Sequence, residues 1–281
     1  MRILITGGSG RLGSWVGRDL RDHGHAIVSV DRQLPATREP GITYRAVELG
    51  DLGQIIGAMV GCDIILHFGA IPSPWSHPDE VVFLNNVGAT YNVLQAALTL
   101  GLRRAIIASS ASAYGMAWAR PTFPPHYAPL DEGHPFLAHD PYALSKEVDE
   151  RTAAMFARRS GMTILAYRFH WIAGPGEAAA RAHNPHFVPR DADATNLWGY
   201  VDIRDAAQAC RLGLTADIDG FAPFNITAAD TLRHEPTADL LRQHLPTVEL
   251  RAPLPGHTSA WSIDKARRLL GYTPHHSWRD D

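Results

Sequence analysis

Five short apolar runs, separated by amphipathic stretches, make up the first 170 residues. The runs are continuously apolar rather than alternating, which is typical of parallel strands that are buried on both faces. The stretches between them repeat apolar residues three and four positions apart, as helices do. This strand–helix alternation predicts a parallel sheet with helices on both faces. The expected strands are residues 2–6, 26–31, 63–70, 104–110 and 163–169, and the expected helices are 11–24, 87–101 and 142–161.

The pattern loosens after residue 170. Residues 173–198 contain several Gly and Pro breakers and no clear period. Beyond them we expect a short strand followed by a helix in 200–217, another strand in 221–227, and two short amphipathic helices in 237–245 and 262–272. A proline-rich stretch, 115–141, precedes the helix expected at 142. Long loops in compact domains are usually functional, so this one is expected to border a site.

A glycine loop connects the first expected strand to the first helix. Its sequence, TGGSGRLG, places Gly7, Gly10 and Gly13 three residues apart, with Arg11 and Leu12 between the last two. Glycines at such a turn let the backbone approach a pyrophosphate at a helix N-terminus, where free N–H groups favour an anion. The loop therefore predicts dinucleotide binding and a Rossmann-type, doubly wound parallel sheet of the α/β class.

A carboxylate at the end of the second strand indicates which dinucleotide is bound. Asp31 lies 18 residues past Gly13 and suits a ribose 2′-hydroxyl. It would repel a 2′-phosphate, so NAD is favoured over NADP. Arg11 and Arg32 could each pair with that phosphate, which leaves NADP open.

A tyrosine and a lysine stand four residues apart in the segment PYALSK. The chain has only two lysines, Lys146 and Lys265, and the first follows Tyr142 at this spacing. Residues i and i+4 share one helix face. The pair is either an incidental surface contact or a phenol whose proton is managed by a neighbouring ammonium, and spacing alone leaves both open.

Composition excludes several classes of protein. The formal net charge is −3 and no basic stripe is present, so nucleic-acid binding is not expected. Arginines scattered among acids, as in residues 149–161, indicate solvated helix faces. Cys62 and Cys210 do not make a disulfide framework. No secretory signal and no apolar stretch near 20 residues is found, so a reduced, cytoplasmic protein without membrane contact is expected. The 15 histidines form no metal-binding motif, and no metal site is expected.

The glycine spacing, YALSK and the serine cluster SSASAYG together resemble the extended short-chain dehydrogenase/reductase superfamily, in particular its NAD-dependent epimerase/dehydratase branch. Four further segments match in the right order: GDL at 50–52, HFGA at 67–70, NVGATYNVLQAA from Asn86, and YVDIRDAA at 200–207. The resemblance extends from residue 1 to about 228. It implies an NAD(P)-binding Rossmann domain of residues 1–170, with 198–228 returning to it, and a small substrate-binding region of residues 171–197 and 229–281.

The resemblance implies a role for each matching residue. Tyr142 would be the catalytic acid/base, Lys146 would favour its phenolate and hold the nicotinamide ribose, Ser110 would hydrogen-bond the substrate oxygen, and Asn86 would be the catalytic asparagine. The implied cofactor-binding residues are Gly7, Gly10, Arg11, Leu12, Gly13, Asp31, Arg32, Asp51, Leu52, Phe68, Gly69, Ala70, Tyr142 and Lys146. The implied substrate contacts are Ser110, Ser112, Trp171 and Arg181.

The chain also departs from its relatives. Trp171 stands where many have an asparagine three residues after the arginine that is Arg168 here. Residues after the strand FNIT are few for holding a whole nucleotide sugar, and Ala111-Ser112 replaces the Asn-His pair of uronate dehydrogenases. Ser110 is followed by ASA rather than the Asp-Glu pair of 4,6-dehydratases, so dehydration is the least expected outcome.

Three functions remain open. The first is an NAD-dependent epimerase moving hydride at a carbinol carbon of a sugar-like substrate. The second is a simple NAD(P)-dependent dehydrogenase or reductase of a small sugar, sugar acid or carbonyl compound, and the third is a non-catalytic dinucleotide sensor. Many relatives dimerise through the Tyr/Lys helix and the helix before it, so a homodimer is expected. Val148, Ala153 and Phe156 are compatible with that contact and equally with core packing.

Overall fold

The computed structural model describes residues 1–184 and 191–280. Its centre is a seven-stranded sheet in the order β10-β7-β5-β4-β1-β2-β3, with every pair parallel. The chain runs outward from β1 to β3 and then returns to build the other half from β4, so β1 and β4 flank the topological switch point. The strands are β1 (Arg2–Thr6), β2 (Ala26–Asp31), β3 (Ile42–Ala46), β4 (Ile64–His67), β5 (Arg104–Ser110), β7 (Thr163–Phe169) and β10 (Phe221–Ile226).

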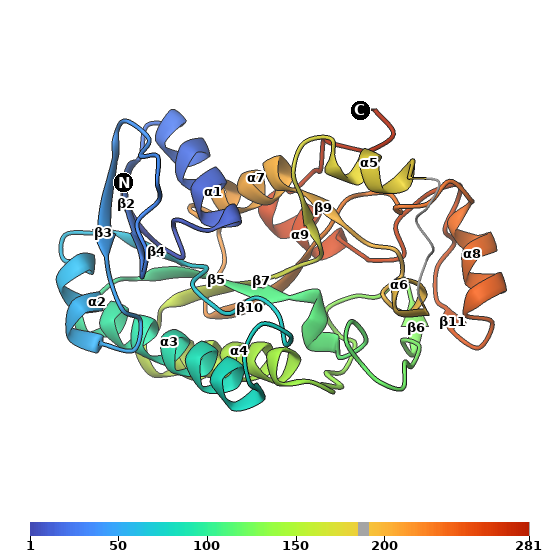
Figure 1. The fold of residues 1–281 in the computed structure, drawn as a ribbon, viewed down its shortest axis with the longest axis horizontal. Coiled ribbons are helices and arrows are strands. Elements are labelled where there is room, and N and C mark those ends of the chain that lie inside the picture. The colour runs from blue at the N-terminus through green and yellow to red at the C-terminus, as the bar shows by residue number, and fades with distance from the viewer. Residues whose placement is uncertain (185–190, 281) are drawn as a thin grey trace.

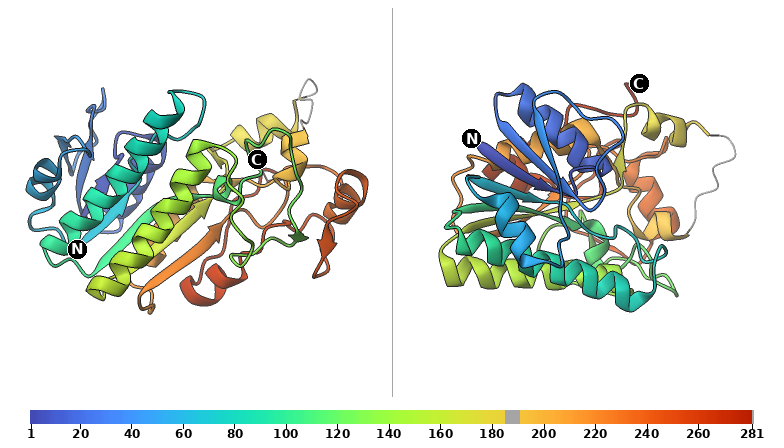
Figure 2. Two further views of the ribbon diagram at one scale, coloured as in Figure 1. Left: turned by 90° about the horizontal axis from the view of Figure 1, so that it is seen from below. Right: turned by 60° about the vertical axis from the view of Figure 1, so that its left-hand side comes forward.

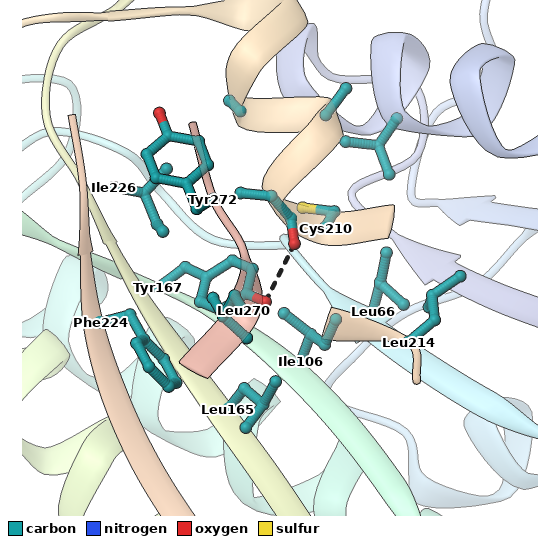
Figure 3. Packing of buried hydrophobic residues seen from close by; sticks show 14 of the residues in the cluster. Leu66, Ile106, Leu165, Tyr167, Cys210, Leu214, Phe224, Ile226, Leu270 and Tyr272 are labelled. Atoms are coloured by element: carbon teal, nitrogen blue, oxygen red, sulfur yellow. Dashed lines mark hydrogen bonds between the residues drawn. The ribbon is translucent and has the colours of Figure 1, made fainter. Parts of the chain in front are cut away.

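Helices cover both faces of this sheet (Figures 1 and 2). One face carries α1 (Arg11–Asp22), α7 (Ile203–Gly213) and α9 (Asp264–Leu270), and the other carries α2 (Leu52–Met59), α3 (Asp79–Thr99) and α4 (Pro141–Ser160). Each face has its own apolar core. Figure 3 shows the first core, where Tyr167 on β7 packs among Ile106, Phe224 and Cys210 and donates its hydroxyl to the Ala209 carbonyl at 3.0 Å. Cys62 and Cys210 are both free and buried.

Local sequence signals set the ends of α4, the helix expected to carry the Tyr/Lys pair. Asp140 caps its N-terminus by accepting a hydrogen bond from the Ala143 N–H at 2.8 Å, and Pro141 occupies the first helical position. Gly161 ends the helix with φ +68°, a left-handed conformation that glycine adopts without strain. These signals fix where the first turn of α4 begins, and Tyr142 lies in that turn.

A smaller region lies beyond one end of the sheet, on the right of Figure 1. It contains the paired short strands β6 (Tyr127–Ala128) with β11 (Glu249–Leu250) and β8 (Ile172–Ala173) with β9 (Val201–Asp202). Its helices are α5 (Glu177–Ala182), α6 (Asp191–Thr195) and α8 (Thr237–His244), and a 3-10 turn, η1 (Ala111–Tyr114), follows β5. Residues 275–278 anchor this region: Asp205 accepts the backbone N–H groups of His275 and His276, and the Trp278 indole donates to the Thr231 carbonyl.

The structure confirms the doubly wound parallel sheet and revises several elements. The strand expected at 63–70 ends at His67, and the helix expected from residue 87 begins at Asp79. β3, α2 and α5 were not expected. β3 is an edge strand whose residues are mostly exposed, so its sequence carries no buried apolar run. No helix within residues 1–184 and 191–280 is long and apolar enough to cross a membrane.

The acids at the start of segment 149–161 do not lie on a solvated face. Arg151 and Arg158 are exposed as expected, but Asp149 is only 1% exposed and Glu150 only 3%. Both carboxylates point into the protein and pair with cations there. That part of the sequence interpretation was wrong, and the buried pairs have consequences for the site.

Candidate active site

A cavity of about 610 Å³ opens where β1, β4, β5 and β7 end, at the switch point of the sheet. Ligands in doubly wound sheets bind in this crevice, outside the carboxyl ends of the strands. Residues from the glycine loop, the Tyr/Lys helix and the smaller region all line it. Fifteen of the expected site residues are among them: Gly7, Gly10, Arg11, Leu12, Gly13, Asp31, Phe68, Gly69, Ala70, Ser110, Ser112, Tyr142, Lys146, Trp171 and Arg181.

The glycine loop is shaped by close backbone contacts. Gly7 has φ +64°, and a Cβ there would lie 2.7 Å from the Gly69 nitrogen. A Cβ on Gly13 would lie 2.3 Å from the Gly7 carbonyl oxygen. Gly10 caps α1 without a side-chain hydrogen bond, so the first N–H groups of the helix remain available to an anion.

Two charged residues frame this loop. Asp31 lies at the end of β2, lines the cavity and accepts the Ser9 N–H at 3.1 Å. Arg11 forms an ion pair with Glu177 at the start of α5, and both side chains are about half exposed. The pair joins the glycine loop directly to the smaller region.

Ser110, Tyr142 and Lys146 meet on the opposite side of the cavity. Ser110 is the last residue of β5, and its hydroxyl oxygen accepts the Ser112 N–H at 3.0 Å. Tyr142 is 9% exposed and Lys146 3% exposed, and the Lys146 ammonium lies 5.8 Å from the centre of the Tyr142 ring. The i,i+4 pair is therefore no surface contact: both side chains are buried at the cavity wall.

Lys146 is held by two partners besides the tyrosine. Its Nζ donates to the Ala108 carbonyl at 2.9 Å and to Asp149 Oδ2 at 3.2 Å. Burial by itself lowers the pKa of Lys146, but the charges of Asp149 and Tyr142 outweigh it, so the pKa lies above its usual value. His67, beneath the site, is neutral because burial lowers its pKa to about 3, with a smaller contribution from Lys146.

Asn86 does not line the cavity. It is 1% exposed, and its side chain accepts the Ile71 N–H at 2.8 Å and donates to the Ile71 carbonyl and to Ser145 Oγ, each at 3.1 Å. These bonds tie α3 to α4 and to the segment after β4. The structure thus gives Asn86 a positioning contact rather than one with the cavity.

Three other expected cofactor residues also lie outside the cavity lining. Arg32 is exposed just beyond β2. Asp51 caps α2 by accepting the Gln54 N–H at 3.0 Å, and Leu52 begins that helix.

The wall facing the cofactor residues comes from segments far apart in sequence. Trp171 follows β7, and the Arg181 guanidinium lies 4.8 Å from its ring centre while pairing with Asp193 at 3.2 Å. Sequence reasoning missed other wall residues, namely Trp118, His170, Asn196, Trp198 and Arg233. The only advance signal was the length of loop 115–141, which contributes Trp118. Burial lowers the pKa of His170 to about 4, so this side chain is neutral in the wall.

The wall includes a buried donor and a buried acceptor without a hydrogen-bond partner among the described residues. One is the indole nitrogen of Trp118, a donor, and the other is the side-chain oxygen of Asn196, an acceptor. Buried polar groups are normally paired, so an unpaired donor and acceptor in a cavity wall fit a hydroxyl-bearing ligand. Within the same described residues, no group of three His, Cys, Asp or Glu side chains is placed to hold a metal.

A buried ion pair supports the floor of the site. Arg168 on β7 binds Glu150 of α4 through two hydrogen bonds, at 2.7 and 2.8 Å, and both side chains are at most 4% exposed. Glu150 also accepts from Ser109, and Arg168 donates to the Tyr114 hydroxyl at 2.7 Å. The network joins β5, β7, α4 and η1 next to Tyr142 and Lys146.

The residues present fit a bound dinucleotide. The glycine cradle leaves no room for a Cβ, the α1 N-terminus is open to a pyrophosphate, and Asp31 stands where a ribose hydroxyl would be recognised. Ser110, Tyr142 and Lys146 lie across the same cavity, so a substrate carbinol could reach both the phenol and the cofactor. The arrangement supports hydride transfer coupled to proton transfer.

Comparisons with known proteins identify the family of the chain. The model of the NAD dependent epimerase/dehydratase family matches residues 3–227. A UDP-glucose 4-epimerase of Corynebacterium glutamicum is 24% identical, over 99% of this chain and 92% of its own. A 2-alkyl-3-oxoalkanoate reductase of Stenotrophomonas maltophilia is 31% identical over 63% of this chain, and the match spans 52% of that relative's length. Among solved structures, a short-chain dehydrogenase/reductase superfamily protein from Agrobacterium tumefaciens with bound NAD superposes with a TM-score of 0.74 at 24% identity, over 99% of this chain and 94% of that one.

Proposed function

The chain belongs to the NAD-dependent epimerase/dehydratase family, and from that premise we propose that it is an NAD-dependent epimerase acting at a carbinol carbon of a sugar or sugar-nucleotide substrate. The observation that carries the proposal is the meeting of Ser110, Tyr142 and Lys146 with the glycine loop in one cavity. A dinucleotide sensor without chemistry would need the loop but no buried phenol–ammonium pair.

Each residue has a defined task in this reaction. A bound NAD would supply the hydride acceptor for the carbinol carbon, and its reduced form the hydride donor. Tyr142 takes the hydroxyl proton, and Ser110 donates a hydrogen bond to the same oxygen. Lys146 favours the phenolate form of Tyr142 and donates its remaining N–H to the nicotinamide ribose. Arg11 and the N–H groups of α1 bind the pyrophosphate, and Asp31 accepts from the ribose, which favours NAD over NADP.

A second candidate is a simple NAD(P)-dependent dehydrogenase or reductase of a small sugar, sugar acid or carbonyl compound. The short substrate-binding region favours it, and Trp171 stands where many relatives have an asparagine. Of the two relatives described above, one is an epimerase and the other is a reductase. Cofactor retention separates the two functions, since an epimerase regenerates its NAD in every cycle.

We further propose a homodimer formed by α3 and α4. Ala153 and Phe156 are fully buried in the core, so they cannot form the contact. The exposed apolar side chains of these helices are Val81, Leu84, Tyr91 and Leu144, and Leu84 is 66% exposed. Only monomer in sedimentation at micromolar concentration would contradict this proposal.

The remaining assignments follow from the same premise. The cofactor part comprises residues 1–170 and 198–228, and the substrate part comprises 171–197 and 229–281, although residues 185–190 lie outside the described structure. We place the protein in the cytoplasm, with a sugar-like small molecule as its ligand and no nucleic-acid or membrane partner.

The first experiment identifies the cofactor. The purified protein is denatured, and the released dinucleotide is identified and quantified by chromatography. Near one NAD per chain after dialysis supports an epimerase. An empty protein that binds NAD or NADP reversibly supports the dehydrogenase, and binding of neither contradicts both.

The second experiment tests the catalytic assignment. Tyr142→Phe is expected to keep dinucleotide binding and to lower turnover by about 10²–10⁴-fold, the usual contribution of a general acid/base. Tyr44→Phe, on β3 away from the cavity, is the matched control and should behave as wild type. Nucleotide sugars and free sugars are screened by product analysis and nicotinamide absorbance. Unchanged turnover in Tyr142→Phe would show that the assignment is wrong.

A further inference from the structure

A buried carboxylate, that of Asp149, lies next to the proposed catalytic pair of Tyr142 and Lys146. Asp149 follows Lys146 by three residues on α4, and its Oδ2 is 3.2 Å from the lysine Nζ. Both side chains are at most 4% exposed. Residues three apart share a helix face, so the carboxylate approaches the ammonium from inside the protein while Tyr142 approaches it from the cavity.

The ammonium has three N–H groups, and their partners can be counted. One goes to the Ala108 carbonyl at 2.9 Å and a second to Asp149. The third is left for the tyrosine and a cofactor ribose. The two bonds therefore fix the position of the ammonium before any ligand binds.

Other ionisable groups around Lys146 do not balance its charge. Glu150 is bound by both arms of Arg168, so its charge is already matched. His67 on β4 is neutral near pH 7, with its pKa at about 3. The residues of α3 at this point, Asn86 and Thr90, carry no charge, and Tyr142 carries one only as phenolate.

An unpaired ammonium in such a place would lose its proton. Removing an amine from water disfavours its charged form and can lower its pKa by several units. For Lys146 burial acts in that direction, and the charge of Asp149 is the largest opposing influence. Burial raises the pKa of Asp149, and Lys146 and the uncharged Thr90 hydroxyl act against that rise. Lys146 is therefore the cation that this carboxylate serves.

We propose that Asp149 is a positioning residue that acts through Lys146: its carboxylate is the counter-ion that keeps the buried amine an ammonium and holds it beside Tyr142. The inference rests on the proposed function for its catalytic meaning, because the charge of Lys146 matters only if Tyr142 exchanges a proton with substrate. Without Asp149, the burial of the amine would be opposed less, so the amine would lose its proton at lower pH and would favour the phenolate over a narrower pH range.

The lysine content of the chain makes a direct test possible. Only Lys146 and Lys265 would appear in NMR spectra of protein labelled with ¹³C at the lysine Cε, and Lys265→Arg assigns the two signals. In cofactor-free wild type, the Lys146 signal should titrate above the pH of an ordinary lysine. In Asp149→Asn it should titrate lower by about one unit or more. Glu147→Gln removes a neighbouring carboxylate that binds Arg151 at the surface, and it should leave the signal unchanged.

Two further variants distinguish a loss of the carboxylate charge from a general disturbance of the structure. Asp149→Glu keeps the charge and should largely restore the titration of Lys146. Asp149→Ser leaves room for water and replaces Asp149→Asn if that variant does not fold. A folded Asp149→Asn or Asp149→Ser protein with the wild-type titration would overturn the proposal. It would equally be overturned if neither variant folds, because the carboxylate would then serve the fold.

The catalytic consequence is measured separately. The alkaline limb of the pH–kcat profile should move to lower pH in Asp149→Asn, and Asp149→Glu should move it back. The NMR titration is performed without NAD, so it decides this inference even if wild type fails to bind NAD and the proposed function fails.

Discussion

The Arg168→Met substitution should lower the free energy of unfolding by much more than the loss of an exposed arginine would. Arg168 fills a buried site between β7 and α4 and donates two hydrogen bonds to Glu150. The exposed fractions of the two side chains are 4% and 3%, so neither charge is screened by water. Arg168→Met leaves the Glu150 carboxylate in the core, where the Ser109 hydroxyl is its remaining hydrogen-bond partner within residues 1–184 and 191–280.

The magnitude follows from this burial. Removing one partner of a buried ion pair usually costs about 3–5 kcal/mol, because the remaining charge stays desolvated. At this chain length, 1 kcal/mol shifts the unfolding midpoint by about 2–4 °C, so the midpoint should fall by roughly 10 °C. Replacing both residues removes the unpaired charge, so the Glu150→Met/Arg168→Met variant should recover most of the lost stability.

The assay is thermal and urea unfolding followed by circular dichroism, with all variants under identical conditions. Arg151→Met is the matched control: it breaks the Arg151–Glu147 pair on the same helix, where Arg151 is 73% exposed. The Arg151 end of this pair is in water, whereas Glu147 is 17% exposed, so the pair should contribute about 1 kcal/mol or less. The reasoning is refuted if Arg168→Met destabilises no more than Arg151→Met, or if the double variant is no more stable than the Arg168→Met variant.

Two further predictions concern the cofactor loop and the behaviour in acid. Glu177→Gln breaks the ion pair between Arg11 and α5, so bound dinucleotide should dissociate a few-fold faster in a displacement assay, in keeping with a partly exposed pair. An unchanged or slower rate would show that the pair does not retain the cofactor. His67 has a pKa of about 3 in the folded protein against about 6.5 when unfolded, so the unfolded state takes up its proton first as the pH falls. Below pH 6.5 this residue should therefore lower the free energy of unfolding by up to about 1.4 kcal/mol per pH unit. In urea unfolding between pH 7 and 5, His67→Gln should show a smaller dependence of stability on pH than wild type. An equal dependence in both proteins would contradict the assignment.

The first half of the fold could be predicted because its signals are local. The β1–loop–α1–β2 unit needs glycines where the backbone passes close to itself, and Gly7 and Gly13 stand at those positions. β3 escaped prediction because an exposed edge strand needs no apolar run. α3 begins eight residues early because Asp79 and Glu80 stabilise its first turn, although the segment has little periodicity.

The candidate site also has a part that the sequence predicts and a part that it does not. The cofactor side comes from short motifs whose spacing is visible in sequence. The wall with Trp118, His170 and Trp198 is assembled from three separate segments, and no spacing rule relates them. Asp149 escaped notice because an acid among arginines on a helix looks solvated, and only packing shows that it faces Lys146.

The order of the segments along the chain has a consequence for biosynthesis. Six of the seven sheet strands, β1 to β5 and β7, lie within the first 169 residues, whereas α5, α6 and α8 come later and β10 completes the sheet edge at Ile226. The chain is synthesised from its N-terminus, and domains generally fold as units. A nascent chain thus has the glycine loop, Asp31 and the Tyr/Lys helix in place while the later wall segments are still being translated. The residues that would hold NAD are therefore translated before the wall that faces them across the cavity.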